Sequence, residues 1–213
     1  MKSKRIFKSL NLAIIVISIL VVLVGGYNIF TVLSGGNIKA AEKDDSLKNE
    51  YYIVGRAPTP YQIENFELLS NELKKESRDD ATISDLIVRA FIIEFFTWSN
   101  KKGAWDVGGQ QYIYNYGLFY DQAIYTYYKD IDTFIEAYGN ENLPEVVSIT
   151  TTDAQSSPET VDEQTYDGYY IEATWEYKTS NAFDVSQFQR QAFFKVIILE
   201  DGKYEIVWFF DQW

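Results

Sequence analysis

The chain has 213 residues, of which 46% are hydrophobic and 23% are charged, and its formal net charge is -12. It contains no histidine and no cysteine. These absences exclude Ser-His-Asp and Cys-His catalytic arrangements, disulfide bonds, and every usual zinc ligand except carboxylates.

The N-terminal part contains a long uncharged stretch. Four basic residues lie within the first eight positions, and no charged residue follows until Lys39. Residues 10–33 supply the roughly 20 mostly apolar residues that a membrane-spanning helix needs. The basic cluster predicts a cytoplasmic N-terminus, with the rest of the chain outside the cytoplasm. The expected organisation is a cytoplasmic basic tail at 1–9, a transmembrane helix at 10–34, a linker at 35–58 and an extracytoplasmic domain at 59–213.

A cleaved signal peptide is the alternative interpretation of this stretch. Its weak point is the cleavage site, because the small-residue candidate Ala40-Ala41 lies well beyond the dense apolar run that ends at Val24. We therefore favour a retained signal anchor and a single-pass protein of the cell membrane.

The charge differs between the two sides of the predicted membrane span. The basic tail contributes four positive charges, so the remainder of the chain is at -16. Phosphate groups are repelled by such an acidic surface. We therefore expect no direct binding of nucleic acid or anionic lipid by the domain.

A first helix is predicted from Thr59 to about Arg78. Thr59 suits the N-cap and Pro60 suits the first helical position. Gln62 completes a capping box with Thr59.

A second helix is predicted from a capping motif at Thr82 to Trp98, with an apolar face at i, i+3, i+4, i+7 spacing. Glu94 alone interrupts that face. Its carboxylate is paired, lies at the mouth of a cavity, or is rotated to the edge of the face. We favour the edge, because an unpaired buried charge is costly.

The aromatic segment after this helix has a weaker pattern. Residues 110–119 predict a short strand or an ordered loop. Residues 121–138 predict a third helix, with Gly139 at the position of a C-terminal cap.

From Leu143 onward the hydrophobic period changes from 3.6 to 2, which predicts strands. Strands are expected at 146–152, 169–178, 191–199 and 204–210, with a polar loop at 154–164. Asp201-Gly202 predicts a tight hairpin between the last two strands.

Helices followed by antiparallel strands indicate an α+β domain, with a long curved sheet around a helix. This order resembles the nuclear-transport-factor-two-like (cystatin-like) cone fold, through the helix sequence DLIVRAFIIEFFTW and the final strands RQAFFKVIILEDGKYEIVWFFDQW. The resemblance covers about residues 59–213. It implies about three helices packed on a curved antiparallel sheet.

The layout of a basic tail, one span, a linker and one cone domain resembles the VirB-eight-like inner-membrane subunits of type IV secretion systems. It is also similar to the TcpC-like conjugation proteins of Gram-positive elements, which usually carry two such domains where this chain has room for one. The resemblance implies a scaffold for conjugal DNA transfer, which self-associates as a homo-oligomer and contacts other secretion-channel subunits. It implies no catalytic residues and no cofactor, so we expect no enzyme activity.

A ligand-binding or sensing domain with an aromatic pocket in the cone is the alternative function. Its candidate pocket residues are Glu94, Trp98, Tyr112 and Tyr114. Some relatives on this fold are enzymes with an Asp base and a Tyr donor, but the spacing here singles out no such pair. No metal site is expected.

Aromatic residues occupy both faces of the C-terminal strand. One face must meet the helices, and we expect Phe209 on the other. Trp208, Phe209 and Trp213 are the candidate contacts with a protein partner, because aromatic residues are enriched at interface hot spots. The alternative is that both faces are covered within the domain.

Overall fold

The computed structural model describes residues 47–182 and 184–210. The expected transmembrane helix at 10–34 and Trp213 lie outside the described residues. Among the residues that are described, no helix combines the length and the apolar character needed to cross a membrane.

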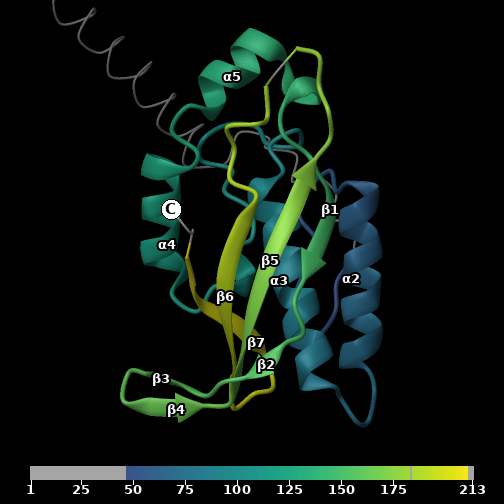
Figure 1. The fold of residues 1–213 in the computed structure, drawn as a ribbon, viewed down its shortest axis with the longest axis vertical. Helices are drawn as coiled ribbons and strands as arrows, with labels where there is room; N and C mark the ends of the chain where they lie inside the picture. Colours follow the sequence, from purple (N-terminus) through teal and green to yellow (C-terminus); the bar gives the residue numbers. More distant parts are fainter. Residues whose placement is uncertain (1–46, 183, 211–213) are drawn as a thin grey trace, which may run out of the picture. The chain divides into compact units, whose positions relative to one another are not determined.

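The domain is α+β, with helices first and an antiparallel sheet last, as the sequence predicts (Figure 1). Its helices are α2 (Pro60–Leu73), α3 (Asp80–Phe96), α4 (Tyr116–Thr126) and α5 (Ile131–Tyr138), with the short 3-10 helices η1 (Gln110–Tyr112) and η2 (Asn140–Asn142). Its strands are β1 (Val146–Thr151), β2 (Gln155–Ser156), β3 (Glu159–Val161), β4 (Gln164–Tyr166), β5 (Gly168–Tyr177), β6 (Gln191–Ile198) and β7 (Tyr204–Phe210).

The main sheet has the strand order β1-β5-β6-β7, and neighbouring strands are antiparallel. Strand β2 also pairs with β5, while β3 and β4 form a separate hairpin. In the second half of β5 the side chains alternate, so that Ile171, Ala173, Trp175 and Tyr177 are buried and the residues between them are exposed. The predicted strand with one wet face is confirmed.

Helix α3 is the centre of the domain. It packs against α2 on one side and against β1, β5, β6 and β7 on the other (Figure 1). Phe91 is fully buried in this helix, stacks on Phe95, and contacts Phe194 of β6 and Phe209 of β7. Each such aromatic pair adds about 0.5–1.5 kcal/mol beyond the burial of its area. A helix with neighbours on all sides must be apolar on nearly all sides.

The helix starts agree with the sequence only in part. Thr59 is the N-cap of α2, and its hydroxyl accepts a hydrogen bond from the Gln62 N–H at 3.2 Å. The capping box is incomplete, because the Gln62 side chain donates to Glu94 instead. The predicted start of α3 at Thr82 was wrong: the N-cap is Asp79, whose carboxylate accepts from the N–H and the hydroxyl of Thr82.

The prediction of one continuous helix at 121–138 was wrong, because the segment contains the end of α4, a turn and α5. The Tyr128 N–H donates to the Ala123 carbonyl, and the chain then turns before α5 begins at Ile131. Tyr128 is fully buried in this turn, and its hydroxyl donates to the Phe95 carbonyl at 2.6 Å. A buried hydroxyl needs a partner, and Tyr128 finds one at the end of α3.

Two segments with weak patterns also have defined structures. Residues 110–119 form η1 and the first turn of α4. The predicted polar loop at 154–164 instead contains β2 and the β3–β4 hairpin, whose turn holds Asp162 and Glu163 at φ 50° and 69°. The predicted hairpin before β7 is confirmed, with Gly202 at φ 81°.

Packing begins inside the expected linker. Tyr52 is fully buried, and its hydroxyl donates to the Tyr204 carbonyl at 2.7 Å and accepts from the Tyr204 N–H at 3.0 Å. A single side chain therefore satisfies both backbone groups of the residue that begins β7.

Replacing Tyr52 by phenylalanine should lower the free energy of unfolding by about 1–3 kcal/mol, because it leaves two buried backbone groups of Tyr204 unpaired. Urea unfolding of the full chain measures this loss. Tyr51→Phe is the matched control, since the Tyr51 hydroxyl donates to the Asp201 carbonyl at an exposed position. The control should change the unfolding free energy by less than about 0.5 kcal/mol. Equal effects of the two substitutions would contradict the assigned role of Tyr52.

Candidate functional site

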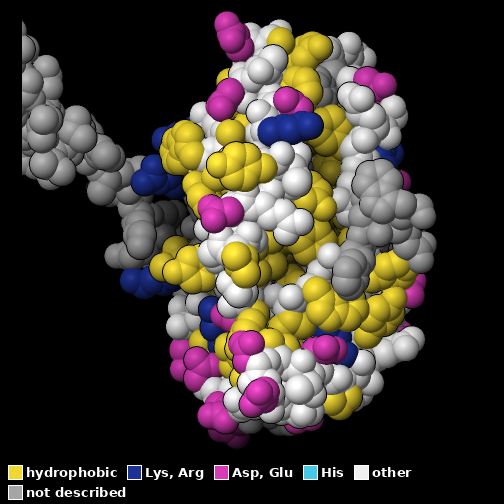
Figure 2. All heavy atoms as spheres, turned by 90° about the vertical axis from the view of Figure 1, so that its left-hand side faces the viewer, with side chains coloured by type: hydrophobic (Ala, Val, Ile, Leu, Met, Phe, Trp, Pro, Cys, Tyr) yellow, Lys and Arg dark blue, Asp and Glu magenta, His cyan; other side chains and the backbone are white. Residues whose placement is uncertain are grey.

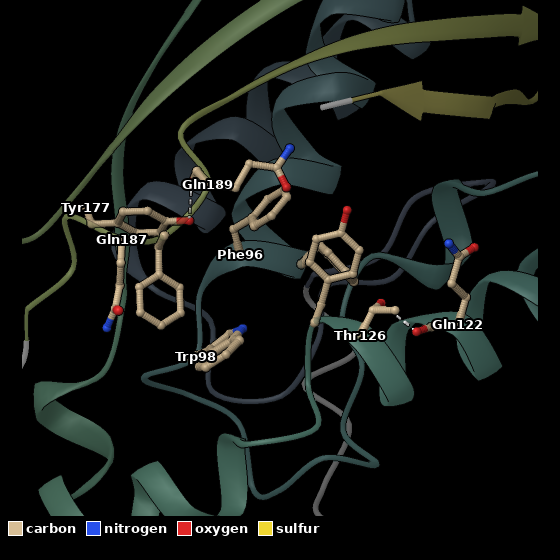
Figure 3. Close-up of a pocket in the computed structure, with 10 residues that line it drawn as sticks. Phe96, Trp98, Gln122, Thr126, Tyr177, Gln187 and Gln189 are labelled. Carbon is tan, nitrogen blue, oxygen red and sulfur yellow. Dashed lines mark hydrogen bonds between the residues drawn. The ribbon is translucent and has the colours of Figure 1, made fainter. Parts of the chain in front are cut away.

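A cavity of about 590 Å³ opens beside α4 (Figure 3). Six aromatic side chains make most of its wall: Phe95, Phe96, Trp98, Tyr127, Tyr177 and Phe188. The other lining residues are Gln122, Thr126, Gln187 and Gln189. Small-molecule sites have volumes of about 300–1,000 Å³ and mostly apolar walls with few polar groups. The cavity therefore has the size and character of a ligand site.

The end of α3 and the start of β1 position one wall of this cavity. The Thr97 hydroxyl accepts from the Val146 N–H at 3.1 Å, and the Trp98 N–H donates to the Pro144 carbonyl at 2.7 Å. These bonds fix the chain where the helix ends. The Trp98 ring then meets the Phe188 ring edge-on, with centroids 5.1 Å apart and planes at 90°.

A short chain of hydrogen bonds holds the neighbouring part of the wall. The Trp175 indole N–H donates to the Tyr177 hydroxyl at 2.9 Å, and that hydroxyl donates to the Gln189 carbonyl at 2.8 Å. Burial raises the pKa of Tyr177, so its hydroxyl remains a donor. The Trp175 ring also lies 4.5 Å from the Phe96 ring. These contacts form the wall before any ligand binds.

The polar side chains of the cavity are uncharged amides, hydroxyls and one indole. Figure 3 shows Gln122 and Thr126 of α4 on one side, and Gln187 and Gln189 on the other. Among the described residues that line the cavity, none carries a charge. The wall can stack on a ligand and exchange neutral hydrogen bonds with it, but it offers no carboxylate or amine for acid-base catalysis.

Glu94 forms a separate buried cluster, one position before the first cavity residue. Its Oε1 accepts from the side-chain amides of Gln62 and Gln111 and from the Tyr112 hydroxyl, each at 3.2 Å. Its Oε2 accepts from the Gly109 N–H at 3.3 Å. Only 6% of Glu94 is exposed. The expectation that Glu94 lies at the edge was wrong, because donors from α2 and from the loop after α3 satisfy the carboxylate.

The charge states in this cluster follow from burial. Burial raises the pKa of Glu94, and the nearby Lys101 charge and the hydrogen bonds oppose that rise. Burial also lowers the pKa of Lys101, whose ammonium donates to the Asn100 side chain at 3.0 Å. Burial raises the pKa of Tyr112 as well, so its hydroxyl stays protonated and donates to Glu94.

Two glycines let the loop approach α3 this closely. A Cβ atom on Gly108 would lie 1.9 Å from the Glu94 carbonyl oxygen. Gly109 has φ 75°, a conformation that side chains disfavour. The Gly109 N–H thereby reaches the Glu94 carboxylate. The cluster connects elements of the fold and contributes no residue to the lining of the cavity.

The structure separates the four candidate pocket residues. Only Trp98 lines the cavity. Glu94 and Tyr112 bond to each other in the buried cluster. The Tyr114 hydroxyl donates to Asp162 at 3.2 Å at the surface, and this bond raises the pKa of Tyr114 to about 12. In the described part of the chain, no group of three His, Cys, Asp or Glu side chains could hold a metal ion.

The prediction that Phe209 faces away from the helices was wrong. The Phe209 ring lies 5.2 Å from Phe91 and so packs on the helices, while the Trp208 ring lies 6.5 Å from Tyr170. A bulge in the pairing of β6 with β7, next to Lys195, adds one residue to β7. The side chains that follow the bulge therefore lie on the opposite face from the one that strict alternation predicts. A partner contact through Trp208 stays a prediction.

The sequence pattern does not identify most of the cavity residues. It predicts Tyr177 in a strand and Gln122 and Thr126 in a helix, and it predicts no element at Phe188 and Gln189. No local pattern marks these residues, because four separate segments meet only in the folded domain.

Comparison with protein-family models, with curated proteins and with solved structures finds no match. The case for a function therefore depends on the geometry of the domain and on the resemblances in its sequence.

The Glu94→Gln variant tests the burial of the carboxylate. The folded pKa of Glu94 lies above its ordinary value of 4.5. The stabilisation from protonated Glu94 is therefore complete below that pH and is lost as the pH rises through the folded pKa. From pH 4.5 to about 7, the free energy of unfolding of the wild type should fall relative to that of the variant. Urea unfolding of both full-length proteins across this range measures the difference.

A second substitution sharpens this test. Tyr112→Phe removes one hydrogen bond to the carboxylate, which raises the pKa of Glu94 further and should leave the protonated form dominant to a higher pH. A difference between wild type and Glu94→Gln that stays constant with pH, or that has the opposite sign, would contradict the assignment.

Proposed function

We propose that the protein is a membrane-anchored scaffold subunit of a conjugative type IV secretion apparatus. It acts through protein-protein contacts outside the cytoplasm, including contacts with further copies of itself. The proposal combines the expected anchor at 10–34 with the layout resemblance and with the α+β order of the domain. An antiparallel sheet around α3 is compatible with a nuclear-transport-factor-two-like cone.

The observation that carries this proposal is the exposed apolar surface of α4. Tyr116, Leu118 and Tyr125 of this helix are exposed by 64%, 71% and 78%, and Trp105 in the preceding loop by 59%. Figure 2 shows hydrophobic side chains gathered on the face of the molecule that α4 occupies. Single exposed apolar residues are ordinary, but a group of them supports a contact with a protein.

Substitution of Leu118 by aspartate should weaken this contact. In-cell crosslinking of the tagged full-length chain in its native host, followed by mass spectrometry, should capture a secretion ATPase and other envelope-spanning transfer subunits. A charge forced into the interface should reduce that capture by about tenfold or more.

Leu68→Asp on α2 is the matched control, because Leu68 is also an exposed helical leucine, at 53%. It should leave capture unchanged. Capture of nothing but the chain itself, or equal loss in both variants, would contradict the scaffold function.

A second candidate function is ligand binding, and the 590 Å³ cavity favours it. Native mass spectrometry of the full chain purified from its host should show a small molecule bound to the wild type. Thr126→Trp should abolish this binding by filling the mouth of the cavity, whereas Tyr125→Trp on the neighbouring exposed position should not. An adduct that persists in Thr126→Trp would contradict binding in this cavity.

A further inference from the structure

We propose that the side chain of Trp213, which lies outside the described residues, occupies the cavity beside α4 through a continuation of strand β7. The inference goes beyond both functions proposed above and depends on neither of them. It assigns the cavity an occupant from this chain, with which a small molecule would have to compete.

The described end of β7 already lies against the wall of the cavity. Phe209 stacks on Phe194 of β6, with ring centroids 5.8 Å apart. The Phe209 ring also lies 6.1 Å from Phe95 and 6.2 Å from Tyr127, and both of these residues line the cavity. Figure 1 shows this end of β7 next to α4. The segment that follows Phe210 therefore starts beside the cavity.

The register of the sheet directs this segment along the cavity. Phe210 of β7 is opposite Phe193 of β6, and the two strands are antiparallel. A continued β7 therefore runs back along β6 toward Gln189, which lines the cavity. In this register Trp213 is opposite Arg190. A strand advances about 3.3 Å per residue, so the three residues after Phe210 carry the chain about 10 Å in that direction.

The same register points the indole of Trp213 toward the helices. Residues directly opposite each other in an antiparallel sheet share a face. Trp175 of β5 is opposite Arg190 on the other side of β6, and its N–H donates to the Arg190 carbonyl at 2.8 Å. The Trp175 side chain is buried, and its ring lies 4.5 Å from Phe96 of α3. Trp213 belongs to this row across the sheet, and it is four residues after Phe209, which faces the helices as well.

The charge that a continued β7 brings with it has a neighbour of opposite sign. Asp211 shares a face with Trp213, and Arg190 is its diagonal neighbour across the strand pair. Diagonal positions are about 7–8 Å apart, within reach of long side chains. The Arg190 guanidinium lies over the Tyr177 ring at 5.8 Å, at the edge of the cavity. The carboxylate of Asp211 would therefore meet a cation there.

The cavity suits an indole that arrives in this way. Its volume of about 590 Å³ accommodates one tryptophan side chain, and none of its described lining residues is charged. The amide and hydroxyl groups among the lining residues offer acceptors for the indole N–H.

Disulfide trapping tests the register directly, because the chain contains no cysteine of its own. Gln212→Cys is combined with Gln191→Cys, the exposed position opposite it in the proposed register. Opposite positions have Cα atoms about 4.5–5.5 Å apart, which a disulfide can bridge. The control pair is Gln212→Cys with Thr174→Cys, since Thr174 is opposite Gln191 on β5 and therefore about 10 Å from position 212. The full chain in lipid nanodiscs is oxidised with glutathione disulfide, and intact mass spectrometry follows the bond.

We expect the 191–212 pair to close within one chain at least about tenfold faster than the 174–212 pair. Trp213→Ala in the 191–212 background should slow closure at least about fivefold, because the indole no longer holds the segment at β6. Thr126→Trp, which fills the mouth of the cavity, should have the same effect. The matched controls Trp105→Ala and Tyr125→Trp, both at exposed positions, should leave the rate unchanged. Urea unfolding confirms that each variant is folded.

Each other outcome overturns the inference. Closure no faster than that of the control pair would exclude the continued strand. Fast closure that is insensitive to both Trp213→Ala and Thr126→Trp would exclude Trp213 as the occupant and leave the cavity to a small molecule. Disulfides formed mainly between two chains would assign the cavity to a segment from a second copy.

Discussion

The buried carboxylate of Glu94 determines where the chain runs after α3. It accepts hydrogen bonds from Gly109 and Tyr112, so the loop after the helix has to return across it. That return places Ile113 beside Ile206 of β7, and α4 begins three residues later. Burying a carboxylate is favourable only with such a set of donors. Helix α4 forms part of the cavity wall. The position of this wall therefore depends on the Glu94 carboxylate, although Glu94 itself does not line the cavity.

Helix α3 keeps two chemically different environments apart. Successive residues of a helix point about 100° from each other, so Glu94 can face the polar cluster while Phe95 and Phe96 face the cavity. The helix backbone itself separates the charge from the aromatic wall. A cavity lined by uncharged residues can therefore exist next to a buried carboxylate.

The sequence predicted the parts of the fold that have local causes. The apolar pattern of α3, the alternation in β5 and the turn at Gly202 all follow from neighbouring residues. The environment of Glu94 could not be predicted, because its partners Gln62 and Tyr112 are 32 and 18 positions away. The same holds for the cavity, which four segments form together. One extra residue in a bulge was enough to place Phe209 on the face that packs on the helices.

Helix α4 belongs to both proposed functions. Gln122 and Thr126 line the cavity, while Leu118 and Tyr125 of the same helix are exposed to solvent. Any shift of α4 on ligand binding therefore changes the surface offered to a partner. By thermodynamic linkage, a partner that prefers one position of α4 must change the affinity for the ligand by the same factor. Contacts on both sides of α4 oppose such a shift, because Ile113 pairs with Ile206 before the helix and the buried Tyr128 donates to the Phe95 carbonyl after it. A ligand or a partner must therefore supply the free energy that disturbs these contacts before the two functions are coupled.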